Sequence, residues 1–304
     1  MDFAEFARAL ARWRQGRRFC LVAVHSTRST HLLARRIVEE YGRESLVPPE
    51  MEVVAWGQTG GVGREGRRWA SPAGKGIYAT LIRHLASDRI RRLPLAISAT
   101  ACETLDRLLG GGGRCRLKWP NDLLVGGRKL GGILIDVVSP PAGAAGAAKQ
   151  GPGALAIISL GVNFSRDLEA FEAPRATSLE AEQPATRVPA AGVPAAGVPA
   201  AGVPAPSLDR TLRELVEAVD AELASEASSP RGAGAPDEAL LDRYRGLSCH
   251  RPGDEIRCRV HGALVTGSFL GFDRHGFLRL DVDGVERTVT SGVIGDGSGP
   301  RAVR

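Results

Sequence analysis

Apolar and polar positions follow two different periods along this chain. Apolar residues three or four positions apart predict helices over four ranges: 3–13, 32–41, 95–109 and 207–224. Short apolar runs rich in β-branched residues predict strands over six ranges: 19–24, 52–56, 77–85, 116–119, 132–138 and 154–160. Strands and helices therefore alternate, but without the strict rhythm that predicts a parallel sheet with crossover helices.

The pattern changes after Arg251, where only short strands are predicted. They cover four ranges: 256–260, 264–271, 277–282 and 285–289. Asp283-Gly284 is a typical hairpin turn, and His275-Gly276 is a second candidate. Closely spaced antiparallel strands of this kind are typical of a small barrel. We therefore expect two domains, one over 1–245 and a smaller one over 246–304.

Three segments interrupt the first domain, at about 139–153, 181–206 and 225–236. They consist largely of small residues and proline, and residues 188–205 repeat Val-Pro-Ala-Ala-Gly. Such sequences bury too little apolar surface to offset the entropy lost on ordering. We predict flexible insertions at all three places.

Composition and charge exclude several classes of protein. The chain has 304 residues, of which 24% are charged, and no apolar run is long enough for a transmembrane helix. The first residues include early acids and do not resemble a signal peptide. Five cysteines without a Cys-x-x-Cys pair indicate reduced thiols. These features predict a cytoplasmic protein without a membrane partner.

A net charge of +6 is compatible with a nucleic acid, a nucleotide or an acidic protein as partner. The basic residues are mostly arginines scattered along the chain, so the charge alone favours none of these partners. Cys249-His250 and Cys258 with His261 match no common zinc spacing, and we interpret them as buried or incidental groups.

The segment from Lys118 to Asp136 has the highest density of residues suited to binding or catalysis. It begins with Lys118-Trp119-Pro120-Asn121-Asp122 and continues, after six residues, with Lys129-Leu130-Gly131-Gly132-Ile133-Leu134. We expect the second lysine on a Gly-Gly turn just ahead of an apolar strand. Two lysines and a carboxylate so arranged would gather charge around a phosphate or an activated acyl group.

A glycine-rich segment lies upstream, over 58–69. Gly61, Gly63 and Gly66 match the dinucleotide fingerprint, but the residues that follow, including Pro72 and Gly74, cannot begin the helix that this fingerprint requires. Glycines let the backbone approach a ligand closely, and the three arginines of this segment are suited to phosphate or carboxylate (Arg64, Arg67 and Arg68). A solvated surface loop is the structural alternative.

Together with Ser159-Leu160-Gly161-Val162-Asn163, these segments resemble the biotin–protein ligase family (biotin–[acetyl-CoA-carboxylase] ligase), in the monofunctional type that lacks an N-terminal DNA-binding domain. The resemblance spans roughly 22–293 apart from the insertions. It implies an α+β fold: a mixed, largely antiparallel sheet with flanking helices, akin to class II aminoacyl-tRNA synthetases, followed by an SH3-like barrel. The implied reaction uses biotin and Mg·ATP to form biotinyl-5′-AMP, and then modifies a lysine of a biotin carboxyl carrier protein.

The resemblance also implies roles for individual residues. The expected biotin-binding residues are Ser26, Thr27, Arg28, Gln58, Val62, Gly63, Arg64, Lys129, Gly131 and Gly132. The expected residues for ATP and the adenylate are Arg64, Arg67, Trp69, Lys118, Asn121, Lys129 and Asn163. The expected catalytic residues are Lys129, Asp122, Arg64 and Arg67. We prefer Ser26-Thr27 to the second pair, Ser29-Thr30, because Ser26 directly follows the predicted strand; helix capping is the alternative for these hydroxyls, and a strand-end turn is the alternative for Asn163.

Val62 departs from the family pattern, and the role of Asp122 stays open. Val62 stands where the family's glycine loop usually has an arginine, which removes a charge-assisted hydrogen bond that Arg68 or Lys75 would have to replace. Asp122 would orient the acceptor lysine, steady Lys118 or bind Mg²⁺ as a metal ligand, and the sequence does not decide among these.

Other functions remain as alternatives at this stage. A lipoate or octanoate ligase or transferase shares the catalytic architecture, and a non-enzymatic nucleotide-binding module is a further alternative. Only about 18 residues precede the first predicted strand, too few for a helix-turn-helix domain, so we expect no specific DNA binding. The oligomeric state is open, with a homodimer as one alternative.

Overall fold

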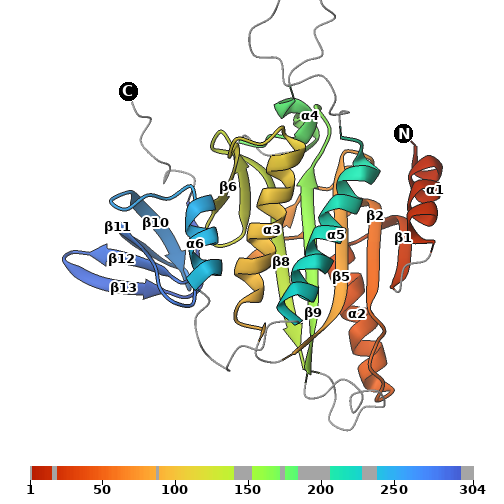
Figure 1. Cartoon of the computed structure of the whole chain (residues 1–304), viewed down its shortest axis with the longest axis horizontal. Helices are drawn as coiled ribbons and strands as arrows, with labels where there is room; N and C mark the ends of the chain where they lie inside the picture. The colour runs from red at the N-terminus through yellow and green to blue at the C-terminus, as the bar shows by residue number, and fades with distance from the viewer. Residues whose placement is uncertain are drawn as a thin grey trace, which may run out of the picture.

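A seven-stranded mixed sheet forms the centre of the molecule (Figure 1). The computed structural model describes residues 2–15, 19–86, 89–139, 153–171, 175–183, 206–227 and 238–295. The sheet has the order β1-β2-β5-β9-β8-β7-β6, with only β1 and β2 parallel. Its strands are β1 (Cys20–Thr27), β2 (Met51–Gln58), β5 (Gly76–Ala86), β6 (Cys115–Lys118), β7 (Asp122–Val125), β8 (Arg128–Val138) and β9 (Gly153–Asn163). The predicted mixed, largely antiparallel sheet is confirmed.

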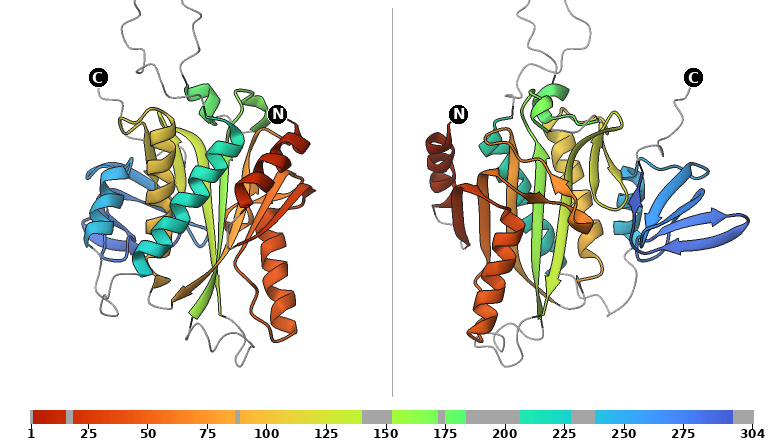
Figure 2. Two further views of the ribbon diagram at one scale, coloured as in Figure 1. Left: turned by 45° about the vertical axis from the view of Figure 1, so that its right-hand side comes forward. Right: turned by 180° about the vertical axis from the view of Figure 1, so that it is seen from behind.

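Helices cover both faces of this sheet because their apolar stripes need burial. The helices are α1 (Phe3–Arg14), α2 (Thr30–Arg43), α3 (Leu93–Leu108), α4 (Leu179–Glu182), α5 (Leu208–Ala227) and α6 (Glu238–Leu247), with a short 3-10 turn η4 (Glu169–Phe171). α3 and α5 lie together on one face, and α2 lies on the opposite face (Figure 2). Beneath α2, Ala34 and Val38 pack on Val53, Ile82 and Ile157.

The C-terminal part forms a separate antiparallel sheet with the order β13-β12-β11-β10-β14. Its strands are β10 (Glu255–Val260), β11 (Ala263–Phe272), β12 (Leu278–Val282), β13 (Val285–Val289) and β14 (Val293–Ile294). The predicted hairpin turn at Asp283-Gly284 has positive φ at both residues (54° and 80°), as a type I′ turn requires. This sheet is compatible with the expected SH3-like barrel. The division between 245 and 246 stays a prediction.

The C-terminal sheet and the central sheet share apolar contacts. The ring of Tyr244 on α6 meets Phe272 edge-on at 5.2 Å, and the indole Nε1 of Trp119 donates to the carbonyl of Gly276 at 3.1 Å. Trp119 is therefore a packing residue that links the Lys118–Asp122 segment to the C-terminal sheet. The hydrogen bond from Trp119 therefore fixes this segment against the C-terminal sheet.

Residues 61–69 form an arm whose structure differs from the expected loop. β3 (Gly61–Val62) pairs with β4 (Arg68–Trp69), and a single 3-10 turn, η1 (Arg64–Gly66), joins them. Glu65 has φ of 56°, and the backbone N–H of Gly63 donates to the carbonyl of Arg67 at 2.7 Å. Strands of two residues leave no periodic signal in a sequence, which explains why this hairpin arm was not predicted.

The predicted insertions overlap regular elements by one to three residues. β9 begins at Gly153, α4 covers Ala181 and Glu182, and α5 continues to Ala227. The flexibility of the three insertions stays a prediction. The Val-Pro-Ala-Ala-Gly repeat lies outside the described residues. None of the helices in the described ranges combines the length and the apolar character needed to cross a bilayer.

Candidate active site

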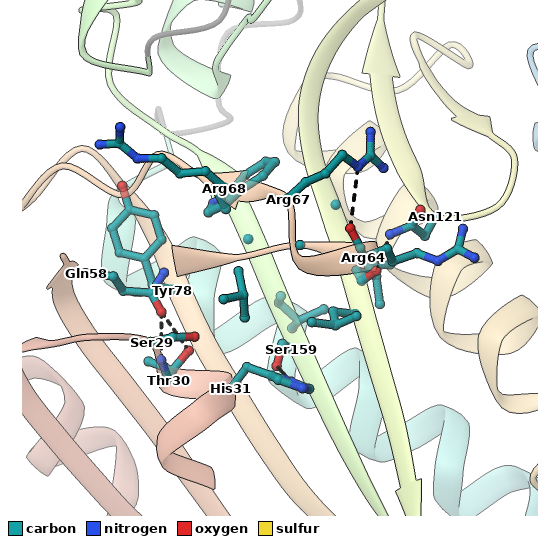
Figure 3. A pocket seen from close by; sticks show the side chains of 18 of the residues that line it. Ser29, Thr30, His31, Gln58, Arg64, Arg67, Arg68, Tyr78, Asn121 and Ser159 are labelled. Atoms are coloured by element: carbon teal, nitrogen blue, oxygen red, sulfur yellow. Dashed lines mark hydrogen bonds between the residues drawn. The ribbon is translucent and has the colours of Figure 1, made fainter. Parts of the chain in front are cut away.

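A cavity of about 140 Å³ lies between the hairpin arm and one face of the central sheet (Figure 3). Six parts of the chain line it: the start of α2, the end of β2, the hairpin arm, β5 at Tyr78, the β6–β7 turn with the first half of β8, and the middle of β9. Its polar lining residues are Ser29, Thr30, His31, Gln58, Arg64, Arg67, Arg68, Tyr78, Asn121, Asp122, Lys129 and Ser159. The aliphatic part of the wall comes from Val62, Ile133, Leu134 and Leu160.

One side of the cavity is a polar floor that is fully hydrogen-bonded within the protein; we define it as Ser29, Thr30, His31, Gln58 and Ser159. Ser29 is the N-cap of α2, and its side chain accepts from the backbone N–H of Leu32. The N–H of Thr30 donates to Gln58 Oε1 at 2.7 Å, and Gln58 Nε2 donates to Ser71 Oγ at 2.7 Å. Both ends of the Gln58 amide are thus fixed before any ligand arrives.

His31 joins this floor to the outer edge of β8. Its Nδ1 lies 2.8 Å from Ser159 Oγ, and its Nε2 lies 3.1 Å from Asp136 Oδ2. His31 is only 5% exposed, and burial lowers its pKa while the neighbouring Asp136 carboxylate opposes that shift. Burial also raises the pKa of Tyr78, whose hydroxyl donates to the carbonyl of Pro72 at 3.0 Å. Both groups are therefore neutral near pH 7.

Lys129 faces the cavity from β8, and its ammonium lies 2.7 Å from Asp122 Oδ1. A register shift between β7 and β8 pairs Leu123 with Gly131 and Leu124 with Lys129. Such a bulge redirects the side chain next to it. The Lys129 ammonium also lies 5.2 Å from the ring centroid of Trp69 on the hairpin arm. The cation is thereby placed between the sheet and the arm.

The expected Gly-Gly turn at Lys129 was wrong. Gly131 and Gly132 lie inside β8, and the turn before that strand is made by Gly126 and Gly127, both with positive φ. A Cβ on Gly131 would come within 2.7 Å of the carbonyl of Gly161. Glycine is needed there because β9 lies too close for a side chain. Gly132 lines the cavity, and Gly131 is not among the lining residues.

The other side of the cavity is the hairpin arm, whose three arginines point in different directions (Figure 3). Arg64 Nη1 donates to the carbonyl of Gly292 at 3.2 Å, and Nη2 donates to Ser291 Oγ at 3.1 Å. Its guanidinium therefore contacts the C-terminal sheet, and burial there lowers the pKa of Arg64. Arg67 and Arg68 are exposed. Val62 pairs with Arg68 across the hairpin.

A second cavity of about 220 Å³ adjoins the first and shares Arg68, Trp69 and Lys129 with it. Asn163, Phe171 and Ala176 line its other side. Asn163 Nδ2 donates to the carbonyls of Lys129 and Thr177, at 3.3 and 3.0 Å. The side chain of Asn163 thus ties the end of β9 to the segment beside Lys129.

Comparisons with known proteins agree with this geometry. Residues 23–147 match the Biotin/lipoate A/B protein ligase family. A 110-residue stretch is 34% identical to the bifunctional ligase/repressor BirA of Escherichia coli K12, covering 36% of this chain and 31% of that protein. The chain thus spans less than two thirds of the length of this relative.

Two longer matches cover most of the chain. The biotin–[acetyl-CoA-carboxylase] ligase of Mycobacterium tuberculosis is 26% identical over 245 residues, covering 79% of this chain and 76% of that protein. The solved structure of a biotin protein ligase from Aquifex aeolicus in complex with biotin and ATP has a TM-score of 0.62 at 19% identity, covering 91% of this chain and 97% of that one. The fold of that structure extends over both sheets of the chain.

The expected Ser-Thr turn of the ligase family was assigned to the wrong pair. Ser26 and Thr27 lie within β1 and pair with Gly57 and Gln58, whereas Ser29 and Thr30 line the cavity. Arg28 is not a lining residue; its carbonyl accepts from the N–H of Gly60. The strand ends three residues later than predicted, at Thr27 instead of position 24, so the turn into the helix falls at the second Ser-Thr pair.

Lys118, which was expected to bind ATP or the adenylate, lines neither of these two cavities. Its charge contributes to lowering the pKa of His250, to about 4, although burial is the larger cause. Lys118 therefore sits near the junction with the C-terminal sheet. Asn121 does line the main cavity, and its Nδ2 donates to the carbonyl of Ile133.

A metal ion would find few protein ligands here. Among the described residues, no group of three or more His, Cys, Asp or Glu side chains could hold a metal ion. Of the residues that line the main cavity, Asp122 alone carries a carboxylate, and it is paired with Lys129. These residues do not fit a resident metal site built from protein ligands alone.

Proposed function

We propose that this chain is an ATP-dependent ligase that joins biotin to a lysine of a biotin carboxyl carrier protein through biotinyl-5′-AMP. One protein and one solved structure that are similar to it carry the names of biotin ligases, and the structure was solved with biotin and ATP. The proposal rests chiefly on one observation: Lys129 and the arginine-bearing arm line the same cavity as the closed polar floor.

The polar floor suits the head of biotin better than that of lipoate. A ureido ring offers two N–H donors and a carbonyl, which match the hydroxyl and amide groups of Ser29, Thr30 and Gln58. The dithiolane ring of lipoate and the chain of octanoate offer no comparable groups. Those ligands would cover these polar groups without making hydrogen bonds to them, and so would lose the hydrogen bonds that water makes there.

Lys129 supports the first step. The biotin carboxylate and the α-phosphate of ATP are both anionic and repel each other as they approach. The Lys129 ammonium, at the junction of the two cavities, offsets this repulsion and stabilises the charge that builds up on the phosphoryl oxygens. We place the biotin head on the floor and the nucleotide in the adjoining cavity beside Trp69.

The arginines support the same step from the arm. Arg67 and Arg68 are exposed, and Arg68 borders both cavities. Arg68 is thus placed to replace the charge missing at Val62. Closure of the arm over the product would exclude water from the mixed anhydride, which hydrolyses readily.

Asp122 supports the second step. The acceptor lysine must lose a proton before it attacks, which costs about 4–5 kcal/mol at pH 7 for a lysine with an ordinary pKa. Asp122 borders the cavity and holds Lys129 at 2.7 Å. We assign to it the orientation of the acceptor ammonium and the removal of its proton. The neutral amine of the acceptor lysine then attacks the carbonyl carbon of biotinyl-5′-AMP, which forms the amide and releases AMP.

Magnesium enters this proposal only with the nucleotide. Mg²⁺ usually keeps several waters and takes phosphate oxygens together with one or two carboxylates. Asp122 would be its protein ligand, in competition with Lys129. The consumption of ATP and the free cysteines of the described residues lead us to place the reaction in the cytoplasm.

Pyrophosphate release tests the first half of the proposal. Purified protein with Mg·ATP should release pyrophosphate when biotin is added, and not when lipoate or octanoate is added. A carrier domain added afterwards should gain the mass of one biotinyl group, and lose that gain when its acceptor lysine is replaced. Release with lipoate but not with biotin would reassign the chain to lipoate chemistry.

A further inference from the structure

Ser71 joins the polar floor to the base of the hairpin arm, two positions after the end of β4. Its Oγ lies 2.7 Å from Gln58 Nε2 and 3.2 Å from the carbonyl oxygen of Trp69. Its own carbonyl accepts from the backbone N–H of Gln58 at 3.0 Å. Ser71 is only 6% exposed and does not line the main cavity. It therefore contacts both sides of the site from behind.

The direction of each hydrogen bond around the Gln58 amide is fixed. The backbone N–H of Thr30 can only donate, so the Gln58 atom 2.7 Å away is the carbonyl oxygen Oε1, and Nε2 faces Ser71. An amide nitrogen does not accept, so the Ser71 hydroxyl accepts from it. The one hydrogen of that hydroxyl then donates to the Trp69 carbonyl, which can only accept.

These bonds decide what Gln58 offers a ligand. Oε1 accepts from the N–H and from the hydroxyl of Thr30, at 2.7 and 3.2 Å, which uses both of its lone pairs. Nε2 donates one of its two hydrogens to Ser71. Every side chain of the floor thus has a partner, yet one Nε2 hydrogen is left over on a residue that lines the cavity. The Gln58 amide therefore offers a donor to a ligand.

Ser71 determines where that donor points. Among the described residues, the Ser71 hydroxyl is the one acceptor for the nitrogen end of the amide, whereas Thr30 holds the oxygen end. Without the hydroxyl, the nitrogen end would be free to turn. A ligand would then have to restrain the amide as it binds, which costs side-chain entropy.

We propose that Ser71 is a positioning residue: its hydroxyl, oriented by the Trp69 carbonyl of the arm, directs one N–H of Gln58 at the bound headgroup. This rests on the proposed function, in which the headgroup is the ureido ring of biotin, whose carbonyl accepts that hydrogen. Ser71 touches no substrate and acts through Gln58. The base of the arm thereby takes part in recognising a neutral headgroup.

The surrounding backbone makes Ser71→Ala a clean test of the hydroxyl. The bond from the Gln58 N–H to the Ser71 carbonyl does not involve the side chain. The Gly74 N–H donates to the Trp56 carbonyl at 2.9 Å, and the Tyr78 hydroxyl donates to the Pro72 carbonyl at 3.0 Å. These bonds remain in the variant, so the segment after β4 keeps its path.

Calorimetry of biotin binding to the whole chain, without ATP, tests the role of Ser71. Ser71→Ala should raise the Kd for biotin by roughly tenfold, as the loss of one buried hydrogen bond predicts. Ser165→Ala is the matched control, because the Ser165 hydroxyl accepts from the N–H of Asp167 and lines neither cavity. It should bind biotin as wild type does.

A double-mutant cycle separates positioning from a general structural role. If Ser71 acts through the Gln58 amide, adding Ser71→Ala to Gln58→Leu should change the Kd by less than about twofold, because the amide is already absent. A serine that only stabilises the fold predicts the same factor in both backgrounds. In assays of pyrophosphate release, Ser71→Ala should also raise KM for biotin while kcat falls much less.

Ser71→Cys keeps the test decisive if Ser71→Ala melts far below wild type. Cysteine places a side chain of similar shape at this position, but its sulfur is only a weak acceptor. We expect Ser71→Cys to weaken biotin binding as well, and again to add little in the Gln58→Leu background.

The possible failures are distinguishable. Absence of biotin binding by the wild-type protein would overturn the proposed function and this inference with it. Biotin binding by folded Ser71→Ala or Ser71→Cys as tight as in wild type, or an equal loss with and without the Gln58 amide, would overturn the inference alone.

Discussion

The two sides of the cavity are built in opposite ways. The polar floor comes from long elements, α2, β2 and β9, and its groups are buried and already hydrogen-bonded to one another. The hairpin arm has two strands of two residues each; Arg67 and Arg68 are exposed, and Arg64 is held by Ser291 and Gly292. Under the proposed function, the floor is ready for a ligand, whereas the arm has to rearrange to bring its arginines to the phosphate.

This difference suggests a division of labour. A rigid floor recognises a neutral headgroup cheaply, because little side-chain freedom is lost on binding. An arm with exposed charges meets its anionic partner only when it closes, which couples charge neutralisation to exclusion of water. Substitutions in the floor should therefore change biotin affinity, and substitutions in the arm should change how well the adenylate is formed and kept.

The largest effect is expected at Lys129, which stands between the two sides. Lys129→Ala should lower biotin-dependent pyrophosphate release by roughly two to three orders of magnitude, as does the loss of one preorganised group that stabilises transition-state charge. Arg128→Ala is the control, since the Arg128 guanidinium pairs with Glu182 at 2.6 Å. Release near the wild-type rate in Lys129→Ala would remove this residue from the chemistry, provided that both variants melt close to wild type.

A substitution in the floor should separate affinity from turnover. Gln58→Leu removes the acceptor of the Thr30 N–H and the donor to Ser71 Oγ. We expect KM for biotin to rise by roughly tenfold to a hundredfold, as the loss of one or two buried hydrogen bonds predicts, while kcat falls much less. A fall in kcat with KM unchanged would place Gln58 in the chemical step. Steady-state assays of pyrophosphate release give both constants.

Gly61 marks the junction of floor and arm. A Cβ there would come within 2.5 Å of the Trp69 carbonyl, 2.7 Å of Ser71 Oγ and 2.9 Å of Gln58 Nε2. Gly61→Ala should therefore disturb both sides and weaken biotin binding by roughly tenfold, the cost of modest overpacking.

Gly63 supplies the matched control. The nearest atom to a Cβ on Gly63 is the Arg67 carbonyl at 3.5 Å, an ordinary contact. Gly63 also lines the cavity, but because its added methyl group meets only an ordinary contact, Gly63→Ala should weaken biotin binding much less than Gly61→Ala in the same titration. Equal losses in the two variants would mean that any side chain in the arm is harmful, regardless of its contact with the floor.

The same contrast explains what the sequence could predict. Long elements with clear periods, such as β5, β9 and α5, were predicted within a few residues. The motif residues Lys129, Asp122 and Gln58 all reach the cavity, because short segments with fixed local geometry position them.

The wrong predictions fall at positions whose structure is determined by contacts between residues far apart in the sequence. Ser26-Thr27 and Ser29-Thr30 are equivalent as local patterns, and only the length of β1 decides which pair begins α2. His31, Tyr78 and Ser159 received no role, since their proximity depends on sheet order. The second Ser-Thr pair, Ser29-Thr30, was the one feature of the sequence that could have drawn attention to the neighbouring His31. Arg64 binds a carbonyl 228 positions away, and no local pattern could indicate that contact.

The smallest effect is expected for a substitution of Ser291, and the direction of the change in ATP affinity is informative. Arg64 has to leave Ser291 and Gly292 before its guanidinium can turn to a phosphate in the cavity. Ser291→Ala removes one of these competing partners, and a single hydrogen bond to a half-buried charged group is worth about 1 kcal/mol after solvent screening. We expect ATP to bind roughly two- to fivefold more tightly in the presence of biotin. Ser268→Ala, at an exposed serine of β11, should leave ATP affinity unchanged. Weaker ATP binding in Ser291→Ala would instead mean that the C-terminal sheet holds Arg64 in its working position, and the arm would then be as preorganised as the floor.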